Sequence, residues 1–471
     1  MHSYNKALLC SALWLTTHSF AFAGQTLADI YALATVNDPD IRAAAASYNA
    51  GKEQLHIGRS ALKPQVSAHY SYSRSDEDSS SEFPFSIDND DNPATPNLEI
   101  INSTQTSAVD TGNNWGVAIN QTLFDVNTWQ QAKQGQARSQ TAHYEYQRAQ
   151  QQLMLRVSQA YIAVLQAAND VNVAKAQLSA DKAQLEQTQE RFNVGAVART
   201  DLHQAQAAYD LSTALLLSSE ARLSNEQRGL SIIIGQDPQQ LMTLAEDFVP
   251  VPPSPAAPTQ WQDQAGSQNL SVKIAQSQRD TAKAVAKAAG ANRLPTVNAK
   301  LAYDDRDTET DDSTFGLYNN SSNGTSFSLN LSLPLYAGGA LGARKREAQA
   351  LYNRSIEYYA GAVRRAQQQA LSAYNDVVID VASIKARKQA LTSARSAADS
   401  IEAGYEAGSH SIIDLLAAKR AYHSAVRDYG NTRLDYLLNS LELKQLAGSL
   451  SGTDIEQLSA HLTHNVAVNS L

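Results

Sequence analysis

A pattern that occurs twice, with the glycines Gly195 and Gly408 separated by 213 residues, restricts the fold of this chain more than any other feature. The two segments read RFNVGAVARTDLHQAQAAYD from residue 191 and AGYEAGSHSIIDLLAAKRAY from residue 403. Five positions match at identical spacings: Phe192, Gly195, Asp201, Leu202 and Tyr209 in the first, and Tyr405, Gly408, Asp414, Leu415 and Tyr422 in the second. Internal repeats of this kind indicate duplication. We therefore expect two similar halves, rather than the roughly three unrelated domains that 471 residues would allow.

The first 23 residues have the features of a secretory signal peptide. They contain Lys6, an apolar run and a small-x-small cleavage site that ends at Ala23. An uncleaved anchor helix is the alternative, but the apolar run is short for a membrane span. A lipoprotein site at Cys10 is disfavoured, since it follows too short an amino-terminal region and a large Leu precedes it. Cleavage after Ala23 removes Lys6 and Cys10, changes the net charge from −9 to −10 and leaves no cysteine for disulfides.

The charge balance and the hydropathy exclude two classes of protein. An acidic chain without a basic stripe is not expected to bind nucleic acid. Beyond the signal, no stretch of 18 or more apolar residues occurs, so we expect no membrane-spanning helix. A membrane role would have to come from strands.

Each half contains a very long predicted helix. Residues 136–194 include no Gly or Pro, and their apolar residues recur at alternating spacings of three and four, which is typical of a coiled coil. These positions are Leu153, Val157, Ala160, Val164, Ala167, Val171, Ala174, Leu178 and, after Asp181, Leu185. In the second half they are Ala370, Tyr374, Val377, Val381, Ile384 and Leu391. A further helix follows each repeated turn, from Thr200 toward Ile234 and from Ser411 toward Ala447, so each half is predicted to hold a helical hairpin.

Alternation of apolar and polar residues predicts four strands, two in each half. They are expected at residues 64–75, 113–125, 295–306 and 325–336. Each is about as long as a tilted strand that crosses a membrane. The segments between them are expected to be solvated, mobile loops, because residues 75–113 hold nine acids and no Lys or Arg and residues 307–324 are rich in Asp, Ser, Asn and Thr. The DNDDN sequence from residue 88 lacks the Gly and the distal Glu of an EF-hand, which disfavours a calcium site there.

These elements predict a first repeat over residues 24–235 and a second over 263–448. A Pro-rich linker, residues 236–262, joins the repeats, and residues 449–471 form a carboxyl-terminal tail.

Four strands are too few for a membrane barrel. Alternating strands are stable in lipid only as a closed barrel, and the smallest outer-membrane barrels have eight strands. Two chains would give a barrel filled by side chains, whereas three would give twelve strands and room for a conduit. The alternative is that the strands form a soluble sheet.

At this point the chain resembles the TolC family of outer-membrane efflux and type I secretion channels. The resemblance lies in RFNVGAVARTDL, IEAGYEAGSHSIIDLL, DPDIRAAAASYNAGKEQL and LSLPLYAGG, and it covers residues 27–458 in both repeats. It implies a mostly α fold with membrane β structure: a homotrimeric 12-stranded β-barrel, four strands per protomer, continued by a long antiparallel coiled-coil tunnel across the periplasm.

The same resemblance implies a function and partners. The protein would be an exit duct in the outer membrane of a Gram-negative bacterium, with no catalytic activity, cofactor or metal. It would pass drugs, toxic small molecules or unfolded proteins. Its tunnel would open when a periplasmic adaptor and an inner-membrane translocase of the RND, ABC or MFS type engage it.

By resemblance, a polar network of Asp210, Tyr405 and His410 closes the tunnel mouth. The best-known member of the family has Arg where this chain has His410, and a His is charged only below about pH 6.5. We therefore hypothesise a pH-sensitive latch. Without the resemblance, Asp210 and Tyr405 would be interpreted as ordinary surface groups.

Two further pairs of positions carry over from the family. Asp414 matches an acidic constriction ring that would favour cations, and Ala417 replaces a second Asp of that ring. Asp201, its repeat partner, is interpreted as a helix N-cap. Gly195 and Gly408 match the turns where adaptors dock, and a Gly that ends a helix also has a structural reason.

Two other classes of function compete with a channel. An enzyme is disfavoured, because the chain has no nucleophile elbow, no HExxH, no Gly-rich phosphate loop and no spaced His ligands. A secreted coiled-coil structural or adhesive protein would explain the heptads and the signal, but not the four strands.

Overall fold

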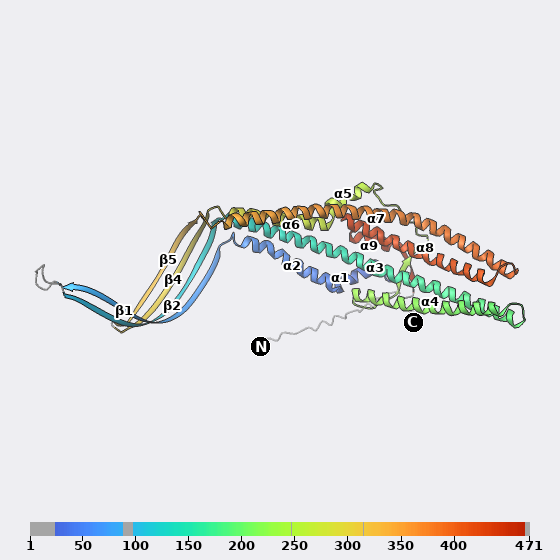
Figure 1. Ribbon diagram of the computed structural model, residues 1–471, viewed down its shortest axis with the longest axis horizontal. Helices are drawn as coiled ribbons and strands as arrows, with labels where there is room; N and C mark the ends of the chain where they lie inside the picture. Colours follow the sequence, from blue (N-terminus) through green and yellow to red (C-terminus); the bar gives the residue numbers. More distant parts are fainter. Residues whose placement is uncertain (1–23, 88–97, 246, 314, 467–471) are drawn as a thin grey trace, which may run out of the picture. The chain divides into compact units, whose positions relative to one another are not determined.

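The computed structural model describes residues 24–87, 98–245, 247–313 and 315–466 (Figure 1). The chain divides into two compact units. We call Tyr48–His143 with Ile274–Ala360 the strand unit, and Met1–Ser47 with Tyr144–Lys273 and Gly361–Leu471 the hairpin unit. The predicted signal peptide and the DNDDN sequence lie outside the described residues.

Helices dominate the described chain. The helices are α1 (Leu27–Asn37), α2 (Pro39–Ser60), α3 (Val126–Asn193), α4 (Arg199–Ile234), α5 (Pro258–Gln268), α6 (Leu270–Ala291), α7 (Ala340–Glu406), α8 (Ile412–Ala447) and α9 (Gly452–Ser459). The strands are β1 (Gln65–Ile87), β2 (Leu98–Phe124), β3 (Leu241–Leu244), β4 (Thr296–Asp312), β5 (Gly316–Ser332) and β6 (Leu462–Val466). No helix within the described residues combines the length and the apolarity that a membrane crossing needs.

The two long helices confirm the predicted coiled-coil seams. In α3 the side chains of Val157, Val164 and Ala167 are fully buried, and in α7 those of Ala370 and Val377 are buried. The helix α3 has 68 residues and begins ten residues before the segment without Gly or Pro. It continues through Gly135, where a Cβ would lie 2.3 Å from the carbonyl oxygen of Gln54. Glycine is therefore required there by the close approach of α2 and not by a turn.

The strand unit contains one antiparallel sheet in the order β1-β2-β4-β5. One row of directly paired residues crosses all four strands: Val66, Ile119, Leu301 and Phe327. Directly paired residues point to the same face of a sheet. All four of these apolar side chains are exposed in the single chain, so one face of the sheet is apolar and bare. The opposite face is polar and carries the His69 imidazole 3.4 Å from the Asp304 carboxylate.

The strands are much longer than the sequence predicted. The prediction that the segments between them are loops was wrong, because most of these residues belong to the strands. Residues 75–87 pair with residues 98–110 as strand, and 307–312 pair with 316–321. Hydropathy located only the apolar part of each strand, whereas the backbone ladder continues wherever partners are in register. Polar side chains also pair across strands: Thr310 donates to Asp110 at 2.6 Å, and Ser107 donates to Asp78. By contrast β5 ends at Ser332, before the predicted residue 336.

The hairpin unit is built around an apolar core that includes elements the sequence did not predict. The predicted linker contains β3 and part of α5, and the tail contains α9 and β6, with β3 and β6 forming a small sheet. Tyr161 of α3 is fully buried in this core, and its hydroxyl donates to the carbonyl oxygen of Met242 at 2.6 Å. Burial is the largest cause of the raised pKa of the Tyr161 hydroxyl. This core fixes the helices from which both hairpins extend.

Candidate functional site

The repeated sequence forms two turns with the same backbone hydrogen bonds, both in the hairpin unit. In the first, the Gly195 N–H donates to the Phe192 carbonyl at 2.9 Å and the Ala196 N–H to the Arg191 carbonyl at 2.8 Å. In the second, the equivalent bonds join Gly408 to Tyr405 at 3.1 Å and Ser409 to Gly404 at 2.8 Å. These bonds satisfy the last carbonyls of α3 and α7. The duplication seen in the sequence is therefore a duplication of turn geometry.

Both turn glycines have a backbone conformation that other residues adopt at a cost. The φ angle is +74° at Gly195 and +79° at Gly408, in the left-handed region. A Cβ at either position would meet no atom within 4 Å. Backbone conformation alone therefore explains these glycines, and space remains around both turns.

The helices that follow the turns start differently. Ser411 is the N-cap of α8 and forms a capping box with Asp414: the Asp414 carboxylate accepts from the Ser411 hydroxyl at 2.7 Å and from its N–H at 3.1 Å. In α4 the N-cap is Ala198, which has no side-chain hydrogen bond. Asp201 lies inside the first turn of α4, so the prediction that it is the N-cap was wrong. The N-cap hydroxyl therefore binds the matching Asp in the second copy, whereas in the first copy Asp201 accepts, among the described residues, only from the adjacent Thr200 hydroxyl, at 3.5 Å.

Tyr405 lies in a small apolar cluster between the two hairpins. The cluster contains Ala205, Tyr405, Ile412, Leu415 and Leu416. Its members come from α4, α7 and α8, and the Arg191 guanidinium of α3 lies 5.4 Å from the centroid of the Tyr405 ring. The Tyr405 hydroxyl is buried and has no hydrogen-bond partner among the described residues. An unpaired buried hydroxyl costs about 1–3 kcal/mol, so this group favours any arrangement that supplies a partner.

The structure of one chain does not join the three predicted gate residues by hydrogen bonds. Asp210 is exposed, and its carboxylate accepts from the Gln206 amide, one helical turn away, at 2.9 Å. His410 lies over Gly404, where an added Cβ would be 2.4 Å from the imidazole Cδ2. Its Nδ1 is 4.0 Å from the Asp414 carboxylate, and both side chains are about half exposed.

Asp414 is the best-defined charge at the second turn. Hydrogen bonds from the Ser411 hydroxyl and then from its backbone N–H lower the pKa of the Asp414 carboxyl, and His410 adds a smaller effect. The carboxylate therefore stays ionised in mildly acidic solution. A charged, exposed carboxylate at this position fits the predicted cation-attracting ring, which requires several copies.

One polar cluster was not identified from the sequence. Asp181 occupies a seam position of α3 and is only 4 % exposed. Burial raises the pKa of its carboxyl, and hydrogen bonds from Ser212 and Gln177 and the charges of His423 and Lys419 oppose that shift. Burial likewise lowers the pKa of the His423 imidazole. The signal was available, because an Asp interrupts the apolar spacing at residue 181.

Comparisons with known proteins agree on one family. The sequence pattern of the family described as outer membrane efflux protein matches residues 30–236 and 261–449. The outer membrane protein TolC of Salmonella enteritidis is 31% identical over 464 residues, which cover 97% of this chain and 89% of that protein. The alkaline protease secretion protein AprF of Pseudomonas aeruginosa is 27% identical over 458 residues, covering 96% and 90%.

A solved structure supports the same fold. The outer membrane protein VceC of Vibrio cholerae superimposes with a TM-score of 0.71 and 17% identity, over 90% of this chain and 96% of that chain. The matched 90% of the present chain is more than either compact unit contains, so the shared fold extends over parts of both units.

Proposed function

The chain belongs to the outer membrane efflux protein family, and from that membership we propose that three copies form one gated duct through the outer membrane. The protein is an outer-membrane exit duct and not an enzyme, and it belongs with the channels of efflux and type I secretion. The secreted adhesive filament considered above is therefore not supported. The finer proposals concern the oligomer, its partners and the residues that gate it.

The observation that carries the trimer is the sheet of the strand unit. It has one bare apolar face and two outer strands, β1 and β5, whose outer edges have no partner strand within the described residues. In lipid, such edges must pair, because no water is present to satisfy their backbone groups. Three copies with four strands each supply the twelve strands that a conduit needs. The apolar face then contacts lipid and the polar face lines the lumen.

The proposed gate uses the second repeated turn. Asp414 from three copies would form a ring that prefers cations, and Asp210, Tyr405 and His410 would form the network that closes the mouth. Its support is the buried, unpaired Tyr405 hydroxyl and the 4.0 Å approach of His410 to Asp414. Protonation of His410 would give this pair opposite charges and strengthen it. Gly195 and Gly408, with open space around them, would lie where a periplasmic adaptor docks.

The partners follow from the kinds of system to which the relatives belong. The name of AprF describes alkaline protease secretion, which requires export from inside the cell. We infer a periplasmic adaptor and an inner-membrane translocase for this chain also. The cargo would be small toxic molecules or unfolded proteins.

Mass and ion conductance test the duct. The purified protein in detergent should have the mass of three chains, and in planar bilayers it should conduct ions with a preference for cations. Asp414→Asn should lower that preference and weaken block by trivalent cations, whereas the repeat-matched control Asp201→Asn should leave both unchanged. The His410→Arg variant should remove any difference in conductance between pH 5.5 and pH 8. A monomer without conductance contradicts the duct, and equal effects of the two Asp variants contradict the ring.

A further inference from the structure

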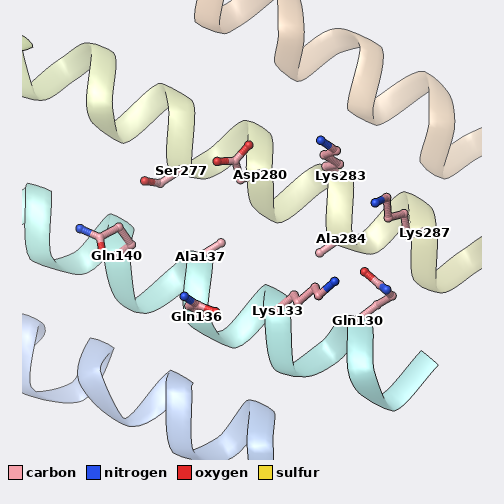
Figure 2. A pocket seen from close by; sticks show the side chains of 10 residues that line it. All are labelled: Gln130, Lys133, Gln136, Ala137, Gln140, Ser277, Asp280, Lys283, Ala284 and Lys287. Carbon is pink, nitrogen blue, oxygen red and sulfur yellow. The ribbon is translucent and has the colours of Figure 1, made fainter. Parts of the chain in front are cut away.

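A cavity of about 430 Å³ lies between α3 and α6 in the strand unit, outside the two turns (Figure 2). Three lysines line it: Lys133 from α3, and Lys283 and Lys287, one helical turn apart, from α6. Figure 2 shows these side chains on the two facing helices, with Gln130 beside them. Nothing in the duct or the gate uses this cavity.

The lining has an excess of positive charge. The only acid that lines it, Asp280, already accepts two hydrogen bonds from the neighbouring Arg279 guanidinium, at 2.8 and 3.1 Å. None of the three lysines forms an ion pair with any residue in the described part of the chain. Three ammonium groups around one cavity favour an anion with several oxygen acceptors, such as a phosphate.

The same cavity also has a free acceptor. The side-chain oxygen of Gln130 is buried and receives no hydrogen bond from the residues that the structure describes. A buried carbonyl oxygen without a donor is unfavourable. A ligand that satisfies this site therefore combines an anionic group with a hydroxyl or an N–H.

The position of the cavity relates it to the apolar face of the sheet. Phe124 pairs with Val297, which lies on that face, and the Phe124 ring contacts the Trp129 ring edge-to-face with centroids 5.5 Å apart. Lys133 follows Trp129 by one turn on the same side of α3, and Gln136 and Gln140, which also line the cavity, continue that stripe. The residues of α3 that line the cavity therefore continue the side of the helix that contacts the apolar face through Trp129.

The distances along the helix match the polar layer of a bilayer. Lys133 is four residues beyond Trp129, or about 6 Å at 1.5 Å per residue. The headgroup layer on each side of a bilayer is roughly 5–8 Å thick. Trp at the boundary of the hydrocarbon, followed by Lys at headgroup depth, is the order found in membrane proteins.

We propose that this cavity binds the phosphate headgroup of an anionic glycerophospholipid in the leaflet next to the helices. The three lysines bind the phosphate oxygens, and Gln130 accepts a hydrogen bond from a headgroup hydroxyl. The inference rests on the proposed function in one respect, since it takes the apolar face of the sheet to contact lipid. It adds a specific lipid site, one in each copy of the chain.

Native mass spectrometry of the full-length protein in detergent tests the site. The probes are dioleoyl phosphatidylglycerol, dioleoyl phosphatidylcholine, which has the same chains without net charge, and soluble sn-glycerol 3-phosphate. The test variant is Lys133→Gln/Lys283→Gln/Lys287→Gln. The matched control is Arg59→Gln/Lys63→Gln/Arg138→Gln, which removes the same charge from exposed residues of the strand unit that do not line the cavity.

The wild type and the control should retain phosphatidylglycerol in preference to phosphatidylcholine. The lysine variant should bind phosphatidylglycerol at least roughly tenfold more weakly, since each lysine near anionic lipid contributes about a fivefold effect. Equal retention by both triple variants would overturn the site and show general charge attraction. Retention of sn-glycerol 3-phosphate as strong as that of the lipid would also overturn it, in favour of a soluble phosphate.

The failure of the duct itself would be seen in a different measurement. That measurement is ion conductance in bilayers of phosphatidylcholine alone, which contain no anionic lipid. The wild type and both triple variants should conduct ions there. A non-conducting wild type would contradict the proposed function, whereas the lipid preference in detergent is measured without a bilayer.

Discussion

The two repeated turns have the same backbone and different polar groups. Both end a long helix at a glycine of positive φ, with two matching N–H to carbonyl bonds. Only the second is followed by a capping box, and only the second has a buried tyrosine at the aromatic position, since Phe192 in the first is partly buried. The comparison shows that the duplication preserved what the backbone requires, while the side chains acquired separate roles.

The difference continues along the hairpins. Gln206 and Asp210 of α4 match Lys419 and His423 of α8 at the same offset of 213 residues. In α4 the pair is exposed and hydrogen-bonded within itself. In α8 both members of the pair interact electrostatically with the buried Asp181 carboxyl and lower its pKa. The second repeat has Ala394 at the position that matches Asp181. Within the described residues, the second repeat therefore has no counterpart of this polar cluster.

The largest difference in stability between the two hairpins is expected from substitution of the leucines that follow the turns. Leu415 is fully buried in the cluster around Tyr405, whereas its repeat partner Leu202 is only partly buried. Leu415→Ala should destabilise the second hairpin by about 3 kcal/mol, which is typical of a buried Leu. Leu202→Ala should have a much smaller effect, because less apolar area is lost. Amide hydrogen exchange in α8 should accelerate by roughly a hundredfold for the first variant.

The Leu202→Ala variant is the matched control, because it removes the same side chain from the equivalent position of the first hairpin. If both variants accelerate exchange equally, the two turns are energetically equivalent and the comparison fails. If only Leu415→Ala does so, the cluster joins the hairpins asymmetrically.

At the starts of α8 and α4, one substitution should lower the stability of the helix and another should raise it. Ser411→Ala should cost about 1 kcal/mol, because the capping box of α8 is lost. Ala198→Ser should stabilise the first turn by a similar amount, since Asp201 already lies at the third helical position, where it can complete a box. Exchange of the first-turn amides of α8 and α4 measures both effects. No gain from Ala198→Ser would mean that the first turn cannot adopt the geometry of the second.

The sequence predicted those features that depend on periodicity. The apolar spacing from Leu153 to Ala174 located the seam of α3, and alternation around Ile119 and Leu301 located the strands and their apolar face. The lengths of the strands were not predictable in this way, because residues such as Asp78 and Thr310 pair through the backbone without an apolar signal. The position of a turn followed from Gly408, but the apolar cluster around Tyr405 depends on contacts between helices that no local pattern encodes.

The predictions for individual charges were the least complete. Asp201 was assigned to the cap from its local sequence, although helix α4 begins two residues earlier. Asp181 was treated as an interruption of the seam, whereas the structure makes it the centre of a buried polar cluster. A charge in a seam position is informative because burial without partners would be unfavourable. Apart from Gln177, one helical turn away on α3, the partners lie more than 30 residues away in sequence, so only the packing of the helices identifies Ser212, Lys419 and His423.

The smallest expected effect is a pH dependence of stability in the second hairpin, which the first hairpin should not show. Burial lowers the pKa of His423 below its ordinary value of 6.5, although Asp181 opposes this shift and Lys419 adds to it. The unfolded chain therefore takes up a proton at a higher pH than the folded chain. The stability from neutral His423 is complete above pH 6.5 and is lost as the pH falls toward the lowered folded pKa. The raised pKa of the Asp181 carboxyl acts in the opposite direction, because its protonation favours the folded state as the pH falls.

Hydrogen exchange in α8, corrected for the intrinsic rate, should show weaker protection at pH 6 than at pH 8. His423→Gln should remove this difference, because it leaves no group that titrates in this window next to Asp181. The matched control is His203→Gln in α4, an exposed histidine, which should keep the wild-type dependence. An equal loss of pH dependence in both variants would show that the effect is a property of surface charge in general. It would also remove the buried cluster from the features that distinguish the two hairpins.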